Sequence, residues 1–355
     1  MPGFSTRLIA WQRTNGRHGL PWQGMRDPYR IWISEIMLQQ TQVAAVIPYY
    51  TRFLERFPDV ASLAAAPVEE VMALWSGLGY YARARNLHRA ACVVMEKHDG
   101  RFPATVTLLT ELPGIGRSTA AAIAAFASNE RAAILDGNVK RVLCRAFGIE
   151  GFPGERSTEQ RLWALAESLL PENVADIGTY IQAQMDLGAT VCTRTRPSCE
   201  NCPLVAQCVA HTAGRTAELP AARARKTPPR RATRVAVIIL NDNVLLERRP
   251  PAGIWGGLLA LPEIPENLQI ETWVKRHLGS DQAHMQPLPP LVHAFTHFTL
   301  EIAPWRVDLP IAPQMLSEPA WQWLALNQTG SAALPTPVRK ILEGVIKQSH
   351  LISTA

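Results

Sequence analysis

The sequence predicts a mainly α-helical N-terminal domain that is followed by a smaller α+β domain. Up to residue 213, apolar side chains recur at helical spacing, with capping and stop signals between the runs. After residue 234, apolar β-branched runs alternate with turn residues. The 355 residues are enough for roughly two domains of about 150 residues each. Hydrophobic residues make up 47% of the chain, so each domain can bury a core.

Start and stop signals locate the helices of the first domain. Proline stands at the start of two apolar-periodic segments, and Glu69 and Glu70 occupy a first turn, where the helix dipole favours negative charge. The expected helices span residues 28–40, 67–75, 117–127, 136–147 and 158–170.

Composition changes between the two domains. Residues 214–234 contain three prolines and seven basic residues against one acidic residue, and they show no periodicity. We therefore expect domains at residues 1–213 and 235–355, with a basic interdomain linker at residues 214–234. The linker is a solvated tether, or a tether that also lies near the phosphates of a nucleic acid.

The second domain reads as strands and helices in alternation. Residues 235–240 and 244–248 are strand-like and flank the turn residues Asn241-Asp242-Asn243, which predicts a hairpin. Residues 298–307 are strand-like in part. Residues 268–278 and 337–348 are helical in pattern, and Gly279 ends the first of them.

Charge and hydropathy exclude some classes of protein. The formal net charge of +6 permits a nucleic-acid partner without proving one. No apolar run approaches the roughly 18 residues of a membrane span. Residues 1–11 lack the pattern of a signal peptide. We therefore expect a cytoplasmic protein without a membrane partner.

Four cysteines are crowded into a stretch of 17 residues. Their spacing is Cys-x6-Cys-x2-Cys-x5-Cys. In a reducing compartment such crowding indicates metal binding rather than disulfides. Four thiolates hold either a zinc ion or a [4Fe–4S] cluster, and the long outer gaps favour the cluster. The ligands would be Cys192, Cys199, Cys202 and Cys208, whereas Cys92 and Cys144 read as small buried hydrophobic residues.

A glycine-containing turn at residues 112–120 separates two helical patterns. Its sequence is Leu-Pro-Gly-Ile-Gly-Arg-Ser-Thr-Ala. Gly114 and Gly116 permit tight backbone, and the amides at the start of the next helix can face an anion. The turn is an ordinary glycine turn, or a hairpin that grips the DNA backbone without reading bases.

Two carboxylates are candidates for catalysis. Glu35 is the one charged residue in the apolar run 31–38. A buried carboxyl has a raised pKa and keeps a proton, as a general acid must. Asp136 stands at a helix start, where the dipole keeps a carboxylate charged. An acid paired with a carboxylate suits cleavage of a glycosidic bond through a cation-like transition state. The alternatives are a surface glutamate and a plain helix cap.

Together these motifs resemble a known family. The chain resembles the helix–hairpin–helix DNA glycosylases that carry a [4Fe–4S] cluster, and within them the adenine DNA glycosylases of the MutY type. The similarity covers nearly the whole chain. The matching stretches are Leu-Pro-Trp-Gln at 20–23, Ser-Glu-Ile-Met-Leu-Gln-Gln-Thr-Gln-Val at 34–43, Trp-Ser-Gly-Leu-Gly-Tyr-Tyr-Ala-Arg-Ala-Arg-Asn-Leu at 75–87, the hairpin at 112–120, and Leu-Asp-Gly-Asn-Val-Lys-Arg-Val-Leu at 135–143.

The resemblance implies a role for each matching residue. Glu35 corresponds to the acid that protonates adenine N7, and Asp136, with Asn138 nearby, to the carboxylate that stabilises the sugar cation. The residues that correspond to contacts with DNA or the flipped base are Trp22, Gln40, Thr41, Leu78, Tyr80, Gly114, Gly116, Ser118 and Gln182. Without the resemblance, Trp22, Leu78 and Tyr80 would be more typical of core packing than of a DNA contact.

The resemblance also bears on reaction type and on the second domain. Ser118 stands where lyase-competent relatives of the endonuclease III type place a Schiff-base lysine, which implies base removal by water without strand cutting.

The C-terminal part resembles the MutT-like (Nudix-fold) domain that reads 8-oxoguanine in this family. Phe295, Thr296 and His297 align with the family's Phe-Ser-His loop, and Thr replaces Ser. Residues 271–276 lack the glutamate pairs of a Nudix hydrolase.

The resemblance therefore implies a monofunctional enzyme that acts at the nucleoid. We also expect a monomer, because nothing in the sequence suggests a symmetric interface. Its substrate would be duplex DNA with adenine opposite 8-oxoguanine or guanine, and the sequence identifies no protein partner. Two alternatives remain. One is an endonuclease III-like glycosylase and lyase, which Ser118 and the second domain disfavour. The other is a DNA-binding protein without catalysis, which Glu35 and Asp136 disfavour.

Overall fold

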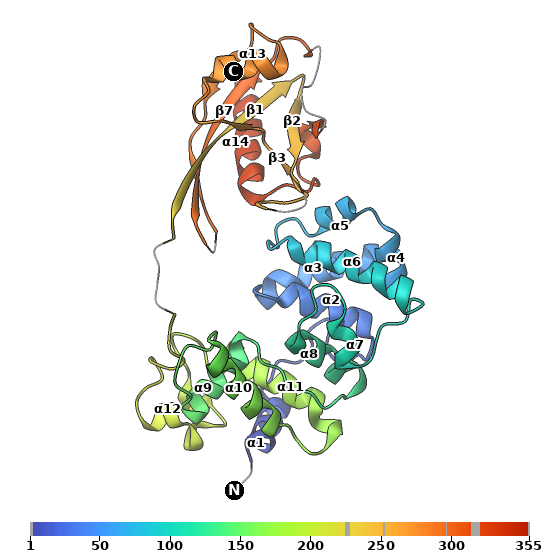
Figure 1. Ribbon diagram of the computed structural model, residues 1–355, viewed down its shortest axis with the longest axis vertical. Helices are drawn as coiled ribbons and strands as arrows, with labels where there is room; N and C mark the ends of the chain where they lie inside the picture. The colour runs from blue at the N-terminus through green and yellow to red at the C-terminus, as the bar shows by residue number, and fades with distance from the viewer. Residues whose placement is uncertain (1–2, 224–227, 251–252, 296, 314–319, 354–355) are drawn as a thin grey trace. The chain divides into compact units, whose positions relative to one another are not determined.

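A computed structural model describes residues 3–223, 228–250, 253–295, 297–313 and 320–353. α-Helices build the N-terminal part, and a twisted sheet with flanking helices builds the C-terminal part (Figure 1). The predicted fold class, mainly α with a C-terminal α+β domain, is confirmed. No helix in the described ranges is both long enough and apolar enough to cross a membrane.

The chain divides into two compact units. The first unit comprises residues 1–65 and 86–225, and the second comprises residues 66–85 and 226–355. We expected a break at residues 214–234 alone, so the grouping of residues 66–85 with the C-terminal part differs from that expectation. Within the second unit, Ser76 and Arg339 join through a hydrogen bond of 3.0 Å, and Arg85 donates to the Gly256 carbonyl over 2.5 Å.

The helices follow their sequence signals closely. Pro28 begins α2, and Asp27 caps it by accepting the N–H groups of Tyr29 and Arg30. The helix ends at Leu38 rather than at the expected residue 40, because Gln40 adopts a left-handed φ of 56°. The α-helices are α1 (Phe4–Asn15), α2 (Pro28–Leu38), α3 (Val43–Arg56), α4 (Val60–Ala65), α5 (Val68–Leu74), α6 (Ala82–Lys97), α7 (Val106–Thr110), α8 (Arg117–Ser128), α9 (Gly137–Phe147), α10 (Arg156–Ser168), α11 (Ile177–Asp186), α12 (Val209–Thr212), α13 (Ile270–Leu278) and α14 (Thr336–Ser353).

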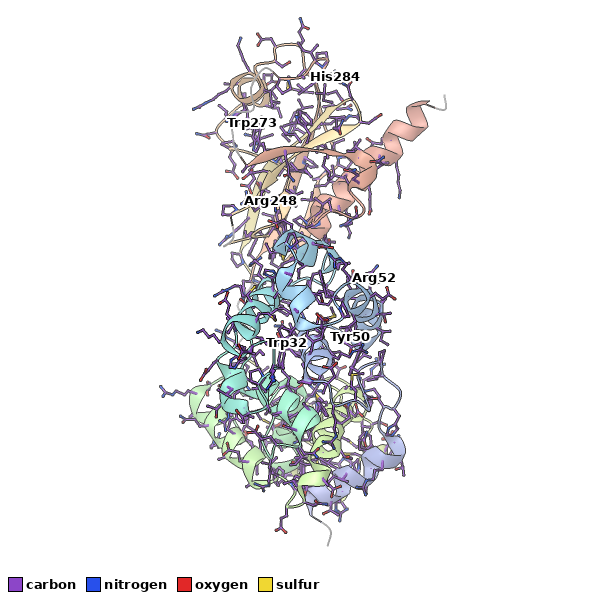
Figure 2. The ribbon with its side chains drawn as sticks, turned by 90° about the vertical axis from the view of Figure 1, so that its right-hand side faces the viewer. Trp32, Tyr50, Arg52, Arg248, Trp273 and His284 are labelled. Carbon is purple, nitrogen blue, oxygen red and sulfur yellow. The ribbon has the colours of Figure 1, made fainter. Side chains whose placement is uncertain are left out.

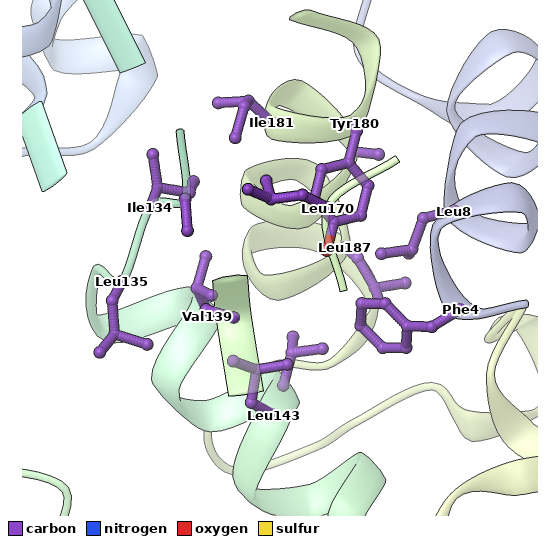
Figure 3. Close-up of a cluster of buried hydrophobic side chains, with 14 of the residues drawn as sticks. Phe4, Leu8, Ile134, Leu135, Val139, Leu143, Leu170, Tyr180, Ile181 and Leu187 are labelled. Atoms are coloured by element: carbon purple, nitrogen blue, oxygen red, sulfur yellow. The ribbon is translucent and has the colours of Figure 1, made fainter. Parts of the chain in front are cut away.

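One core of the first unit lies where α1, α9 and α11 meet. Figure 3 shows Phe4 and Leu8 of α1 facing Tyr180 of α11, with Val139 and Leu143 of α9 on the other side. Each of these side chains is at most 7% exposed. Because this core fixes the first turn of α9 against α11, it also fixes the residues at the ends of both helices.

The second unit is a mixed sheet with helices on both faces. Strands β1 and β7 pair in parallel, and β1 also forms an antiparallel hairpin with β2. The hairpin prediction is confirmed: Asn241 and Asp242 both take positive φ, as a two-residue turn requires. The strands are β1 (Arg230–Leu240), β2 (Asn243–Arg248), β3 (Leu259–Ala260), β4 (Glu263–Ile264), β5 (His284–Pro287), β6 (Leu291–Ala294), β7 (Thr299–Asp308) and β8 (Trp321–Ala325).

Alternation along β1 explains why two helices cover the sheet. Val235 and Val237 pack with Leu342 of α14 in one core, whereas Ala236 and Ile238 pack with residues of α13 in the other. Successive side chains of a strand point to opposite faces, so the continuously apolar part of β1, residues 235–240, needs cover on both faces. Trp273 of α13 belongs to the second of these cores (Figure 2).

The expected linker is structured at both of its ends. Leu219 is 2% exposed, and its carbonyl accepts from Nε of Arg145, which is itself buried. At the other end, β1 begins at Arg230, inside the stretch that we expected to be irregular. The β1 register with β7 runs from Arg230 onward, so strand pairing extends through basic residues that carry no apolar signal.

Candidate active site

A cavity of about 800 Å³ opens between α2, the loop before it, the start of α9 and the helix α11. This volume lies within the range of small-molecule and cofactor sites. Its walls include both predicted catalytic carboxyls and several residues of the predicted base contact. The lining side chains that the sequence singled out are Trp22, Glu35, Thr41, Asp136, Asn138 and Gln182.

Glu35 lies on α2 among buried apolar neighbours. Trp32, which is labelled in Figure 2, lies one turn earlier and is completely buried. Its ring centroid lies 4.9 Å from that of Phe102. Glu35 itself faces the cavity and is half-buried. Burial and, secondarily, the negative charge of Asp136 raise the pKa of Glu35 to about 8. The carboxyl therefore holds its proton at neutral pH.

Asp136 is the N-cap of α9 and accepts the N–H of Val139 over 2.8 Å. Burial is the largest influence and raises the pKa of Asp136. The N–H groups of Val139 and Asn138, and then the charges of Arg141 and Lys140, act in the opposite direction. We expected the helix start to keep this carboxylate charged; the structure adds an opposing effect of burial that the sequence did not reveal.

Asn138 is held in place by Arg141, one turn along α9. Nη2 of Arg141 donates to Oδ1 of Asn138 over 2.8 Å and to the Gly188 carbonyl over 2.7 Å. Nε of the same guanidinium donates to the Cys192 carbonyl. A Cβ atom at Gly188 would stand 2.5 Å from Cβ of Asn138, so this close approach requires glycine. The start of α9 and the segment before the first cysteine are thereby joined.

The remaining predicted contact residues differ in their surroundings. Trp22 is 8% exposed, and its ring meets the edge of Tyr50 at 5.3 Å. Gln40 is exposed and is not part of the cavity wall. In the second unit, Leu78 is buried, whereas Tyr80 is 48% exposed and has a left-handed φ of 49°. An exposed aromatic ring on strained backbone is suited to stacking on a base.

The sequence analysis missed two charged residues of the cavity region. Asp186 is completely buried, and Arg17, a lining residue, pairs with it over 2.7 Å. The signal that singled out Glu35, a lone carboxyl in an apolar helical run, also applies to Asp186 in residues 180–187. Its partner could not be found in this way, since it lies 169 residues away in the chain.

The predicted hairpin connects α7 to α8. Gly114 has φ of 82°, and Gly116 is the N-cap of α8. The hydroxyl of Ser118, in the first turn of α8, accepts the N–H of Leu135 over 3.0 Å. Helix α8 thereby holds Leu135, the residue that precedes Asp136, and connects the glycine hairpin to the candidate carboxylate.

Replacing Gly114 by Ala is expected to destabilise the first unit by about 1–3 kcal/mol, because the left-handed backbone strains any other residue. In addition, the new Cβ would stand 2.8 Å from Cβ of Asn86. The urea midpoint of unfolding measures the effect. Gly116→Ala is the matched control, since Gly116 has an ordinary φ and open space around it. Equal midpoints for the two variants would contradict this reading of the hairpin.

The four clustered cysteines share one small cavity. The pKa of the Cys202 thiol is raised to about 11, chiefly by burial and to a smaller extent by the neighbouring cysteines. Four partly buried thiols that line one small cavity are costly to ionise unless a cation compensates them, so the donor set fits a metal group. In the described part of the chain, no group of three or more His, Cys, Asp or Glu side chains is placed so that it could hold a metal ion.

Arg145 of α9 organises the loop that carries these thiols. Its guanidinium is 3% exposed and donates to the carbonyls of Thr193 and Arg194 over 2.7 and 2.9 Å. It also approaches Sγ of Cys192 at 3.4 Å. A buried guanidinium is stable here because these acceptors, together with the Leu219 carbonyl, satisfy its donors.

The predicted lesion-reading loop lies in the second unit. Phe295 stacks on Phe298 at 4.5 Å and meets the edge of His293 at 4.6 Å. His297 is exposed. Thr296 lies outside the described residues, so its hydroxyl has no described position.

Comparisons with known proteins agree with this architecture. Residues 33–168 match the family of HhH-GPD superfamily base excision DNA repair proteins, and residues 234–344 match the NUDIX domain family. The adenine DNA glycosylase of Buchnera aphidicola subsp. Schizaphis graminum is 37% identical over 342 residues, which cover 96% of this chain and 98% of that protein. The adenine DNA glycosylase of Mus musculus is 33% identical and covers 95% of this chain and 77% of its own length.

A solved structure shares the fold of the first unit. A thermostable thymine-DNA glycosylase is 30% identical, has a TM-score of 0.53, and covers 59% of this chain and 95% of its own. The full-length relatives decide the family, since they exceed 30% identity over almost the whole chain. The chain belongs to the adenine DNA glycosylase family and is a DNA-repair enzyme that hydrolyses the N-glycosyl bond of adenine in DNA.

Proposed function

We propose that the adenine removed is one mispaired with 8-oxoguanine or guanine in duplex DNA. The C-terminal domain supports this, because it matches the NUDIX family but lacks the glutamate pairs that such a hydrolase needs. A retained fold without its metal-binding residues is suited to binding an oxidised purine rather than hydrolysing a nucleotide. Phe295, Thr296 and His297 would supply the contact with the damaged base.

The observation that carries the proposed mechanism is that Glu35 and Asp136 line one cavity while the pKa of Glu35 is about 8. The base would be swung out of the stack into this cavity. Glu35 donates its proton to N7 of adenine, and the bond to C1′ breaks with its electron pair leaving on the base. Asp136 stabilises the positive sugar, and water adds at C1′ and loses a proton.

The proposed reaction ends at an abasic site. A strand-cutting relative would need an amine to form a Schiff base with the sugar. Ser118 occupies the position where the resemblance places that lysine, and its hydroxyl is engaged by the N–H of Leu135. We therefore propose a monofunctional enzyme. We also propose that it acts as a monomer.

One assay tests substrate and reaction type together. Labelled duplexes carry adenine opposite 8-oxoguanine, guanine or thymine, and each product is analysed with and without alkali. We expect alkali-dependent cleavage opposite 8-oxoguanine, slower cleavage opposite guanine and none opposite thymine. Cleavage without alkali, with a large borohydride-trapped adduct, would favour an endonuclease III-like lyase. Binding without base loss would favour a non-catalytic protein.

We also propose that Cys192, Cys199, Cys202 and Cys208 hold one [4Fe–4S] cluster. The cluster would crosslink the loop 192–208 and compensate the charge of its partly buried thiolates. Arg194 and Arg196, which lie in this loop, would then be fixed where they can meet DNA phosphates. Gly114 and Gly116 of the hairpin, and Gln40, Thr41, Leu78 and Tyr80, would make the other DNA contacts.

The cluster predicts a metal content that can be measured directly. Purified protein is expected to be brown and to contain four irons per chain, and Cys199→Ala is expected to lose most of that iron. Cys92→Ala is the control, because Cys92 lies outside the four-cysteine cavity and should keep four irons. One zinc per chain without iron in anaerobically prepared protein would rule out the cluster.

A further inference from the structure

Asp186 is a buried carboxylate to which the proposed mechanism gives no role. It is the last residue of α11, just before the π-helical turn η2 (Leu187–Val191), and it is completely buried. Its oxygens accept from the backbone N–H of Arg17 over 2.9 Å and from Nε of Arg17 over 2.8 Å. Nε2 of Gln182, one turn earlier on α11, donates to Oδ1 over 2.8 Å.

This arrangement fixes the direction of the Gln182 amide. The two ends of a glutamine amide have nearly the same shape, and an isolated amide can adopt either orientation. A carboxylate paired with a guanidinium accepts hydrogen bonds and donates none. The NH2 end of Gln182 must therefore turn toward Asp186, which leaves Oε1 directed away from it. Since Gln182 lines the 800 Å³ cavity, an acceptor is available to a base bound there.

We propose that Asp186, held by Arg17, is a positioning residue that sets base specificity through the orientation of Gln182. The fixed amide oxygen accepts an N–H of the exocyclic amino group of adenine. A 6-oxopurine presents an oxygen at the same position, and the two acceptors repel each other. This inference rests on the proposed contact between Gln182 and the flipped base.

The Arg17 side of the pair has a second effect on the same cavity. The Arg17 carbonyl accepts from Nε2 of Gln23, and Oε1 of Gln23 accepts the N–H of Leu20. The loop 17–23, which includes Trp22, is thus tied internally and anchored to α11 through Asp186. Replacing Asp186 therefore disturbs both the loop 17–23 and Gln182 on α11. An effect on the orientation of the Gln182 amide must be distinguished from a general loosening of the cavity.

The test measures a ratio that general loosening leaves unchanged. Single-turnover rates are compared for adenine and for hypoxanthine, each opposite 8-oxoguanine. In Asp186→Asn, the new side-chain amide can donate to Oε1 of Gln182. The Gln182 amide can then adopt the flipped orientation, with its NH2 group directed into the cavity. We expect the adenine-to-hypoxanthine ratio to fall at least about tenfold, since buried polar groups of the wrong kind strongly reject an analogue. Gln182→Met is expected to lower the ratio equally.

A double variant shows whether Asp186 changes the adenine-to-hypoxanthine ratio through Gln182. If Asp186 acts through Gln182, then Asp186→Asn with Gln182→Met has the same ratio as Gln182→Met alone. Arg17→Lys keeps the charge but loses the forked contact, and it is expected to lower the ratio by a smaller factor. This variant tests the proposal even if Asp186→Asn fails to fold, and an unchanged ratio in it overturns the proposal.

Two further results also overturn the inference, and they can be distinguished from each other. An unchanged ratio in Asp186→Asn, with a lowered ratio in Gln182→Met, means that Gln182 reads the base without help from Asp186. An unchanged ratio in Gln182→Met removes the base contact itself, and with it both the proposed role of Gln182 and this inference.

Discussion

Glu35→Gln is expected to lower the single-turnover rate of adenine release by about 10²–10⁴-fold, the usual contribution of a positioned general acid. Glutamine keeps the size and polarity of the side chain on α2 but has no acidic proton to give to the base. Binding of the mispaired duplex should persist, because the change leaves the hairpin and the cavity shape intact. Alkali-treated time courses and a binding titration on the same duplex measure the two quantities.

The pH dependence of the reaction provides the control for this variant. Because the pKa of Glu35 is raised to about 8 and the proposed mechanism requires the protonated form, the wild-type rate should fall as the pH rises through about 8. The residual rate of Glu35→Gln should lack that decline. A wild-type rate that stays constant from pH 7 to pH 9.5 would exclude Glu35 as the proton donor.

Asp136→Asn is expected to lower the rate of adenine release by about 10²–10³-fold, the usual loss when one preorganised electrostatic group is removed. Asparagine removes the negative charge that, in the proposed mechanism, faces the developing sugar cation. It also remains a good N-cap, so the hydrogen bond to the N–H of Val139 can persist. The melting temperature should therefore change little while the activity is lost.

Asp136→Ala separates the two roles of this residue. Alanine removes both charge and cap, and it should cost about 1 kcal/mol of stability beyond the asparagine variant. Thermal unfolding of the two variants, measured beside single-turnover assays, gives both numbers. If Asp136→Asn retained wild-type activity, Asp136 would be a structural cap only.

Local signals predicted much of the helical part. Asp27 and Pro28 mark the start of α2, and Asp136 marks the start of α9, because caps act over one turn of the chain. The β-hairpin at Asn241 and Asp242 was equally predictable from its turn residues. Glu35 stood out for a similar reason, as a single charge in an apolar helical run.

The sequence did not reveal which side chains interact when they lie far apart in the chain. The partner of Asp186 comes from a loop near the N-terminus, and nothing in the local pattern of Arg17 indicates a buried ion pair. The raised pKa of Asp136 likewise depends on how the cavity closes around it, not on its place at a helix start. The association of Ser76 with Arg339 arises from packing across distant parts of the chain.

The most direct test of the paired carboxyls uses a duplex in which a cationic pyrrolidine replaces the sugar of the target nucleotide. Asp136→Asn should bind this duplex at least about tenfold more weakly than the wild type, because it loses attraction to the fixed positive charge. Both proteins should bind a neutral tetrahydrofuran duplex equally well. Equal affinity of both proteins for the cationic duplex would contradict the assignment of Asp136 to the sugar cation.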